Sequence, residues 1–212
     1  MKTEVKICGL TNDGDARAAL ECGADYIGFV LYPKSPRFVS PDAMKDILNK
    51  LSGTFRAVAV VVNLERERIA EILRDCPLYA IQFHGDEEPG VAVDLGVEIW
   101  RSVHLEDGSF QPDPDSWPAD RYVVDGSSRR DRTYGGTGIQ IDLSSAASFA
   151  KRYASMLSGG LACSNVANAI RGVRPGGVDV SSGIEKEPGL KNVQQMARFI
   201  EIVRQMSETG SQ

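Results

Sequence analysis

Three segments of the chain place a chemically useful side chain where a short apolar run stops. Cys8 follows the first such run, and Asp125 closes the run that begins at Tyr122. The run that ends at Val180 leads into Ser181-Ser182-Gly183. If these runs are parallel strands, their ends meet at one edge, where α/β sheets and barrels build their active sites. A thiol, a carboxyl group and a loop suited to phosphate would then meet, which predicts an enzyme.

Two glycine-containing loops are suited to hold a phosphate. Gly159-Gly160 follows one apolar run, and Ser181-Ser182-Gly183 follows the next. Glycine lets the backbone approach an anion closely, and N–H groups at the start of a short helix, expected at 165–171, can bind it. A third segment, with Gly136 at its centre, lies in a long loop that either closes over a ligand or simply connects two elements.

Cys8 and Asp125 are the candidates for proton transfer. Cys22, Cys76 and Cys163 are interpreted as small buried hydrophobic residues, which is the usual role of a free cysteine. Cys8 differs because it stands at the end of a strand, where a partly ionised thiol can be a nucleophile or a proton carrier. Asp125 has the same position, and a carboxyl group at the end of a buried strand is costly unless it is paired or functional.

Two further side chains allow a structural or a binding role. His84 is either a structural histidine held in one tautomer or a contact to a ligand. Arg37, between Pro36 and Phe38, is either simply exposed or binds a second anion, such as a carboxylate, through its planar fork.

The elements that must position these residues alternate along the chain. Several strand-like runs are apolar on both faces, which is typical of parallel strands covered by helices. The predicted strands are 4–8, 26–31, 56–62, 78–83, 97–103, 121–125, 154–158 and 177–180. The predicted helices are 13–22, 41–51 capped by Ser40, 64–74 capped by Asn63, 87–95, 145–153, 165–171 and 190–206, with a degenerate helix at 113–119.

Eight such units in one chain of 212 residues predict an α/β fold, a single-domain (β/α)8 TIM barrel over residues 1–206 with a frayed tail at 207–212. A doubly wound open sheet is the alternative. That fold usually has a glycine-rich G-x-G-x-x-G turn after its first strand, and Cys8-Gly9-Leu10-Thr11 does not fit.

Composition excludes several other classes. The net charge of −5 favours neither a nucleic-acid partner nor a membrane surface. No apolar run approaches the roughly 18 residues that span a bilayer, and the start of the chain does not resemble a signal peptide. The four cysteines form no C-x-x-C pair, which argues against a zinc site or a disulfide framework. We expect a cytoplasmic protein without a metal.

Taken together, the motifs resemble the phosphoribosylanthranilate isomerase family of tryptophan biosynthesis, over residues 4 to about 200. The resemblance rests on motifs that occur in the family's order: Lys6-Ile7-Cys8-Gly9, Pro33-Lys34-Ser35-Pro36-Arg37, Gln82-Phe83-His84-Gly85, Asp125, Gly135-Gly136-Thr137-Gly138, Gly159-Gly160-Leu161, Asn165-Val166, Asp179 to Glu185, Pro188-Gly189 and Lys191.

The resemblance implies an Amadori rearrangement of a phosphorylated aminosugar by general acid–base catalysis, with no cofactor. Carried over by motif, Cys8 is the expected base, Asp125 the expected acid and Arg37 the contact to the anthranilate carboxylate. The expected substrate-binding set is Arg37, His84, Gly136, Gly159, Gly160, Asp179, Ser181, Ser182 and Gly183. The oligomeric state stays open between monomer and homodimer.

Three other functions compete with this prediction. The histidine-pathway isomerase performs the same rearrangement on a related aminoaldose, but that family usually has an aspartate where this chain has Cys8. A non-catalytic barrel that binds phosphorylated metabolites would normally have lost one of the two acid–base groups. A thiol hydrolase that pairs Cys8 with His84 lacks an evident oxyanion site.

Overall fold

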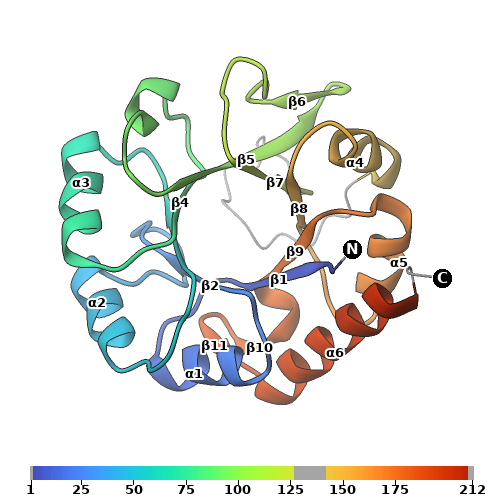
Figure 1. The fold of residues 1–212 in the computed structure, drawn as a ribbon, viewed down its shortest axis with the longest axis horizontal. Helices are drawn as coiled ribbons and strands as arrows, with labels where there is room; N and C mark the ends of the chain where they lie inside the picture. Colours follow the sequence, from blue (N-terminus) through green and yellow to red (C-terminus); the bar gives the residue numbers. More distant parts are fainter. Residues whose placement is uncertain (1, 127–141, 210–212) are drawn as a thin grey trace.

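The computed structural model describes residues 2–126 and 142–209, and a closed barrel dominates this part of the chain (Figure 1). Within those ranges eight parallel strands pair side by side, and the pairing of β4 with β5 closes the ring. The strands are β1 (Glu4–Ile7), β2 (Tyr26–Val30), β3 (Ala57–Val61), β4 (Ala80–Phe83), β5 (Glu98–Glu106), β7 (Arg121–Asp125), β8 (Ser155–Ser158) and β9 (Gly177–Val180). The closed ring confirms the TIM barrel and excludes the open doubly wound sheet.

Helices cover the outside of the barrel (Figure 1). They are α1 (Asp13–Glu21), α2 (Pro41–Asn49), α3 (Arg66–Asp75), α4 (Leu143–Ala150), α5 (Val166–Val173) and α6 (Val193–Thr209). Every residue of β3 is buried, as expected for a strand with the barrel interior on one side and helices on the other. Among the residues that the structure describes, no helix is long and apolar enough to cross a membrane.

Two units depart from the expected helices. After β4 the chain forms only a short 3-10 helix, η1 (Pro89–Ala92), where a helix over 87–95 was predicted. After β5 it turns at Asp107 and Gly108, both with positive φ, into the antiparallel strand β6 (Ser109–Gln111). An Asp-Gly pair is a strong signal for such a hairpin, because both turn positions require positive φ. Residues 113–119 form turns.

The predicted helix caps have different outcomes. Ser40 caps α2 as predicted, and its hydroxyl accepts a hydrogen bond from Ala43 N. The prediction for Asn63 is wrong: it adopts φ 52°, its side-chain oxygen accepts from Asp86 N, and α3 begins only after Glu65. Asn63 therefore joins the loop after β3 to the loop after β4.

The last unit is more elaborate than a strand followed by a helix. After β9 come η3 (Ser182–Ile184) and a small antiparallel ribbon, β10 (Glu185–Glu187) with β11 (Leu190–Lys191). Helix α6 then starts at Val193 and continues to Thr209, past the expected boundary at Met206. The Ser207 hydroxyl accepts a hydrogen bond from Thr3 N at 3.0 Å, which ties α6 to the start of β1.

Two apolar clusters hold the barrel together. The larger lies between the strands and the helices and includes Phe29, Phe83 and Phe199, all fully buried. The smaller fills the barrel interior below the site, where the Trp100 ring stands edge-on to Tyr26 at 4.9 Å between centroids. Complete burial of each such side chain contributes about 1.5–3 kcal/mol. Because these clusters are apolar, the polar side chains of the site lie at the ends of the strands.

Candidate active site

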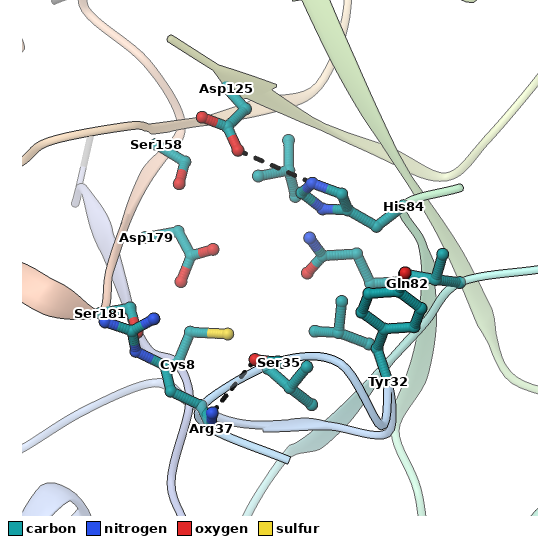
Figure 2. A pocket seen from close by; sticks show the side chains of 14 residues that line it. Cys8, Tyr32, Ser35, Arg37, Gln82, His84, Asp125, Ser158, Asp179 and Ser181 are labelled. Atoms are coloured by element: carbon teal, nitrogen blue, oxygen red, sulfur yellow. Dashed lines mark hydrogen bonds and ion pairs between the residues drawn. The ribbon is translucent and has the colours of Figure 1, made fainter. Parts of the chain in front are cut away.

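A pocket opens at the carboxyl ends of the barrel strands, and Figure 2 shows side chains from several of them pointing into it. Asp125 is the last residue of β7, and Cys8 and His84 each directly follow a strand. In Figure 2 Cys8 and Asp125 lie on opposite sides of the pocket, with Asp179 between them. The pocket is lined by Cys8, Val30, Tyr32, Ser35, Arg37, Val60, Val62, Gln82, His84, Val123, Asp125, Ser158, Asp179 and Ser181.

The Cys8 thiol lies beside a buried ion pair. In the parallel register of β1 with β9, Lys6 is the partner of Asp179, and Lys6 Nζ lies 3.0 Å from Asp179 Oδ2. Burial raises the pKa of the Cys8 thiol, while the charge and hydrogen bond of Lys6 oppose this rise and Asp179 adds to it. Lys6 therefore favours the thiolate at a site where burial opposes it.

Lys6 remains charged despite complete burial. Burial lowers the pKa of Lys6, but Asp179 and Cys8 outweigh that effect, so its pKa lies above the ordinary value. A glycine on the next strand makes room for the arrangement. A Cβ atom on Gly28 would lie 3.0 Å from Cys8 Sγ and 3.1 Å from Lys6 Nζ, closer than side chains pack without displacement. Gly28 thus allows the thiol and the ammonium group to meet.

Asp179 presents one free carboxylate oxygen to the site. Its Oδ2 binds Lys6, while its Oδ1 is buried and has no hydrogen-bond partner among the described residues. Burial raises the pKa of Asp179, Lys6 opposes this, and the nearby Asp125 carboxylate raises it further. A buried oxygen without a partner is uncommon, so a ligand hydroxyl at this position would complete its hydrogen bonding.

Asp125 faces His84 across the upper part of the pocket (Figure 2). His84 Nε2 lies 3.8 Å from Asp125 Oδ2, and both side chains are buried. Burial lowers the pKa of His84 to about 4, although Asp125 pulls in the opposite direction. His84 is therefore neutral at neutral pH. Its Nδ1 lies 2.8 Å from Ser102 Oγ, a residue that sequence reasoning did not single out.

Arg37 is held in place rather than exposed. Its Nε and Nη2 atoms donate to the two carboxylate oxygens of Glu185, at 2.9 and 2.7 Å. Glu185 also accepts from Lys191 Nζ at 2.7 Å. Burial raises the pKa of Glu185, but the hydrogen bonds and charges of Arg37 and Lys191 outweigh this effect, so its pKa lies below the usual value. A bidentate pair fixes the plane of the guanidinium group. The third nitrogen, Nη1, has no hydrogen-bond partner in the described ranges.

The two predicted phosphate loops lie against each other. A Cβ atom on Gly183 would lie 1.9 Å from Leu161 O, so only glycine allows the loops after β8 and β9 to touch. Gly159 and Gly160 both have positive φ, at 88° and 64°. Asn165 does not cap α5: its side chain accepts from Ala162 N and donates to Gly160 O. It fixes the glycine loop and leaves the first N–H groups of α5 uncapped.

The structure brings together six of the predicted residues in the pocket wall: Cys8, Arg37, His84, Asp125, Asp179 and Ser181. Gly159, Gly160, Ser182 and Gly183 lie in the adjoining loops and do not line that pocket. Gly136 lies outside the described residues. In the part of the chain that the structure describes, no group of three His, Cys, Asp or Glu side chains could hold a metal ion.

Sequence reasoning gave no role to Lys6, Gln82, Ser102 or Glu185. Strand periodicity could have found two of them. Side chains two residues apart share a face, so Lys6 accompanies Cys8 and Gln82 accompanies His84. Ser102 and Glu185 act through partners on other elements, which only the three-dimensional arrangement reveals.

Comparison with known proteins identifies the family. The profile of N-(5'-phosphoribosyl)anthranilate isomerase matches residues 5–202. The chain belongs to this family. A relative of that name from Magnetococcus marinus is 37% identical over 210 residues, which covers 98% of each chain. Members are enzymes of tryptophan biosynthesis, and the chain is an isomerase of that pathway.

Solved structures of the family share the fold. One, in complex with reduced 1-(o-carboxyphenylamino)-1-deoxyribulose 5-phosphate, is 33% identical with a TM-score of 0.80, covering 96% of this chain and 99% of that one. Another shows monomers generated from the dimeric isomerase of Thermotoga maritima. It is 34% identical with a TM-score of 0.79, again with 96% and 99% coverage.

Proposed function

We propose that the chain converts N-(5-phosphoribosyl)anthranilate to 1-(2-carboxyphenylamino)-1-deoxyribulose 5-phosphate, with Asp125 as general acid and Cys8 as general base. The observation that carries this assignment is the position of the two groups on opposite sides of one pocket, with Lys6 beside the thiol (Figure 2). A sugar held between them presents its ring oxygen to one group and a carbon-bound proton to the other.

Two proton transfers assigned to Asp125 and Cys8 precede the final tautomerisation. Asp125 protonates the furanose ring oxygen, the C–O bond breaks, and the ring opens to a protonated Schiff base. The Cys8 thiolate, favoured by Lys6, then removes the proton from the adjacent sugar carbon. The electron pair moves to the Schiff base nitrogen and gives an enolamine, which tautomerises to the ketose. Each acid or base role contributes on the order of 10²–10⁴-fold in rate.

Binding groups surround this centre. Arg37, oriented by Glu185, binds the anthranilate carboxylate through its remaining N–H groups. Asp179 Oδ1 accepts a hydrogen bond from a sugar hydroxyl. The loops at Gly159-Gly160 and Ser181-Ser182-Gly183 bind the phosphate, and Gly136 belongs to the same proposed set. The product analogue bound to a relative supports a ligand of this size and charge. No cofactor takes part.

Complementation of a tryptophan auxotroph that lacks this isomerase tests the proposal. The parent chain and Cys76→Ala restore growth, whereas Asp125→Asn and Cys8→Ala do not. Turnover by the purified proteins follows the same order. A near-normal rate for Asp125→Asn would contradict the acid assignment.

Substrate choice and assembly are tested separately. Turnover measured on this substrate and on the histidine-pathway aminoaldose shows preference for the anthranilate compound, and the reverse preference would refute it. The protein is a cytoplasmic monomer or homodimer, and sedimentation of the purified chain distinguishes the two states. The dimeric Thermotoga maritima relative supports the second.

A further inference from the structure

A short hydrogen-bond network links two residues of the pocket wall, Gln82 and His84, through Ser102, which lies behind them. Gln82 on β4 places Nε2 3.0 Å from Ser102 Oγ on β5, and the same oxygen lies 2.8 Å from His84 Nδ1. Gln82, Ser102 and His84 are all buried. Ser102 does not line the pocket, so it can influence the reaction only through its neighbours.

The direction of these hydrogen bonds determines which nitrogen of His84 carries the proton. A serine hydroxyl has one proton to donate. A serine oxygen can accept two hydrogen bonds, but Gln82 Nε2 and His84 Nδ1 are the only side-chain partners of Ser102 Oγ in the described ranges. Gln82 Nε2 donates to this oxygen, so the hydroxyl proton finds an acceptor only at His84 Nδ1. A neutral imidazole has one N–H group, and here it is at Nε2, the nitrogen that faces Asp125 Oδ2 at 3.8 Å.

We propose that Ser102, fixed by Gln82, is a positioning residue that holds neutral His84 as its Nε2–H tautomer and so aims an N–H group at Asp125. An N–H group on the Oδ2 side fixes the orientation of the Asp125 carboxyl group relative to the pocket. The same N–H group strengthens its attraction to the carboxylate once the acidic proton of Asp125 has been given to the substrate. This consequence for the rate rests on the proposed role of Asp125.

The charged neighbours are compatible with a neutral ring. Asp125 favours a protonated imidazole, whereas burial, His104, Arg101 and Lys6 disfavour it. The opposite tautomer requires that the Gln82 amide turns so that Oε1 accepts the Ser102 proton, or that this buried proton has no acceptor among the described residues. His84 Nδ1 would then donate to Ser102, and a bare Nε2 would face Asp125.

Nitrogen NMR of the imidazole rings decides between these two states. The chain has only two histidines, His84 and His104, so a His104→Asn variant assigns both sets of signals. We expect an unprotonated Nδ1 and a protonated Nε2 for His84 at neutral pH. In Ser102→Ala both signals move toward the averaged position of exchanging tautomers, and Ser102→Thr restores them. A protonated Nδ1 in the parent protein, or unchanged signals in Ser102→Ala, would overturn the proposal.

Kinetics give a second measurement. Ser102→Ala lowers kcat by about fivefold, as expected for the loss of one buried hydrogen bond that acts on the acid, while KM stays the same. Ser155→Ala removes another buried serine, at the opposite end of the barrel, and leaves kcat unchanged. A rise in KM alone would contradict the positioning role. Failure of the acid assignment is distinguishable, because Asp125→Asn would then remain active whatever the tautomer of His84.

Discussion

The two ends of the barrel differ in how far their polar groups are paired. At the amino-terminal end Glu4 accepts from the Tyr26 hydroxyl at 2.9 Å and from Arg121, and the Arg121 guanidinium lies 5.0 Å from the centre of the Trp100 ring. At the carboxyl end Asp179 Oδ1 and Gln82 Oε1 are buried without a hydrogen-bond partner in the described ranges. The charged groups named at the first end have partners within the protein, whereas the two oxygens at the second end would gain a partner from a ligand.

This difference separates stability from function. Satisfied hydrogen bonds and stacked cations at the amino-terminal end add to stability, and none of the unpaired buried atoms found among the described residues belongs to Glu4, Tyr26 or Arg121. Unfilled positions at the other end cost stability, and a structure retains them where a substrate will fill them. Substitutions at one end should therefore change mainly the free energy of unfolding, and substitutions at the other should change mainly turnover.

The largest expected effect on turnover is at Asp125. Asp125→Asn removes the acidic proton and should lower kcat on the order of 10²–10⁴-fold, with no loss of thermal stability. The matched change Glu4→Gln at the other end should leave kcat unchanged and lower the free energy of unfolding by about 1–3 kcal/mol. Steady-state rates and urea titrations measure both. A stability loss in Asp125→Asn as large as that in Glu4→Gln would contradict the separation of stability from function between the two ends.

Trp100→Ala tests the packed interior at the amino-terminal end. Trp100 is fully buried, and its truncation should cost about 3–5 kcal/mol through lost contacts and a new cavity. We expect the folded fraction to keep the parent kcat. Activity per folded molecule, measured against the circular dichroism signal, checks this. A lower kcat in fully folded protein would mean that the two ends are coupled.

Arg37→Ala should act on binding rather than on chemistry. Loss of hydrogen bonds between charged groups raises KM by about 10–100-fold, with a smaller change in kcat. The exposed Arg68→Ala on α3 is the control and should change neither parameter. Unchanged substrate saturation in Arg37→Ala would remove Arg37 from the carboxylate site.

The smallest effect, and the most specific, concerns pH. Lys6 lowers the pKa of the Cys8 thiol against the effect of burial. Lys6→Met therefore raises that pKa, and the rising limb of kcat/KM with pH moves to higher pH. The rate at neutral pH should fall by about tenfold, the effect of losing one neighbouring charge. Ultraviolet titration of the thiolate gives an independent measure, and a limb that moved to lower pH would contradict the role of Lys6.

The fold could be predicted from the sequence because its strands have an unmistakable pattern. The run from Ala57 to Val62 is apolar on both faces, which a covered parallel strand requires. Predictions from residue type were wrong where a turn determines the backbone. Asn63 is a residue type that often caps helices, but here it adopts positive φ and its side chain accepts a hydrogen bond from the loop after β4. Asp107-Gly108 has the residue types of a hairpin turn, and here the hairpin forms in a unit whose helix the sequence predicts to be degenerate.

The site could be predicted only in part, for a physical reason. Cys8, Asp125 and Ser181 stand at strand ends, and strand ends can be located from sequence. The ion pair of Lys6 with Asp179 depends on the register of two strands that lie 173 positions apart in the chain. Glu185, on β10, binds Arg37 from 148 positions further along the chain. Long-range partners of this kind leave no local pattern.

Burial of the Cys8 thiol has a consequence for oxidative damage. Oxidants and alkylating reagents attack exposed thiolates. Burial raises the pKa of Cys8, Cys22 and Cys163 alike, so exposure distinguishes them, and Cys8 is only 8% exposed. Cys22 and Cys163 are only partly buried, which corrects the interpretation of both as buried residues, whereas Cys76 is buried as expected. Mild oxidation should therefore modify these two sulfurs first, and the enzyme should keep its activity while Cys22 and Cys163 are oxidised.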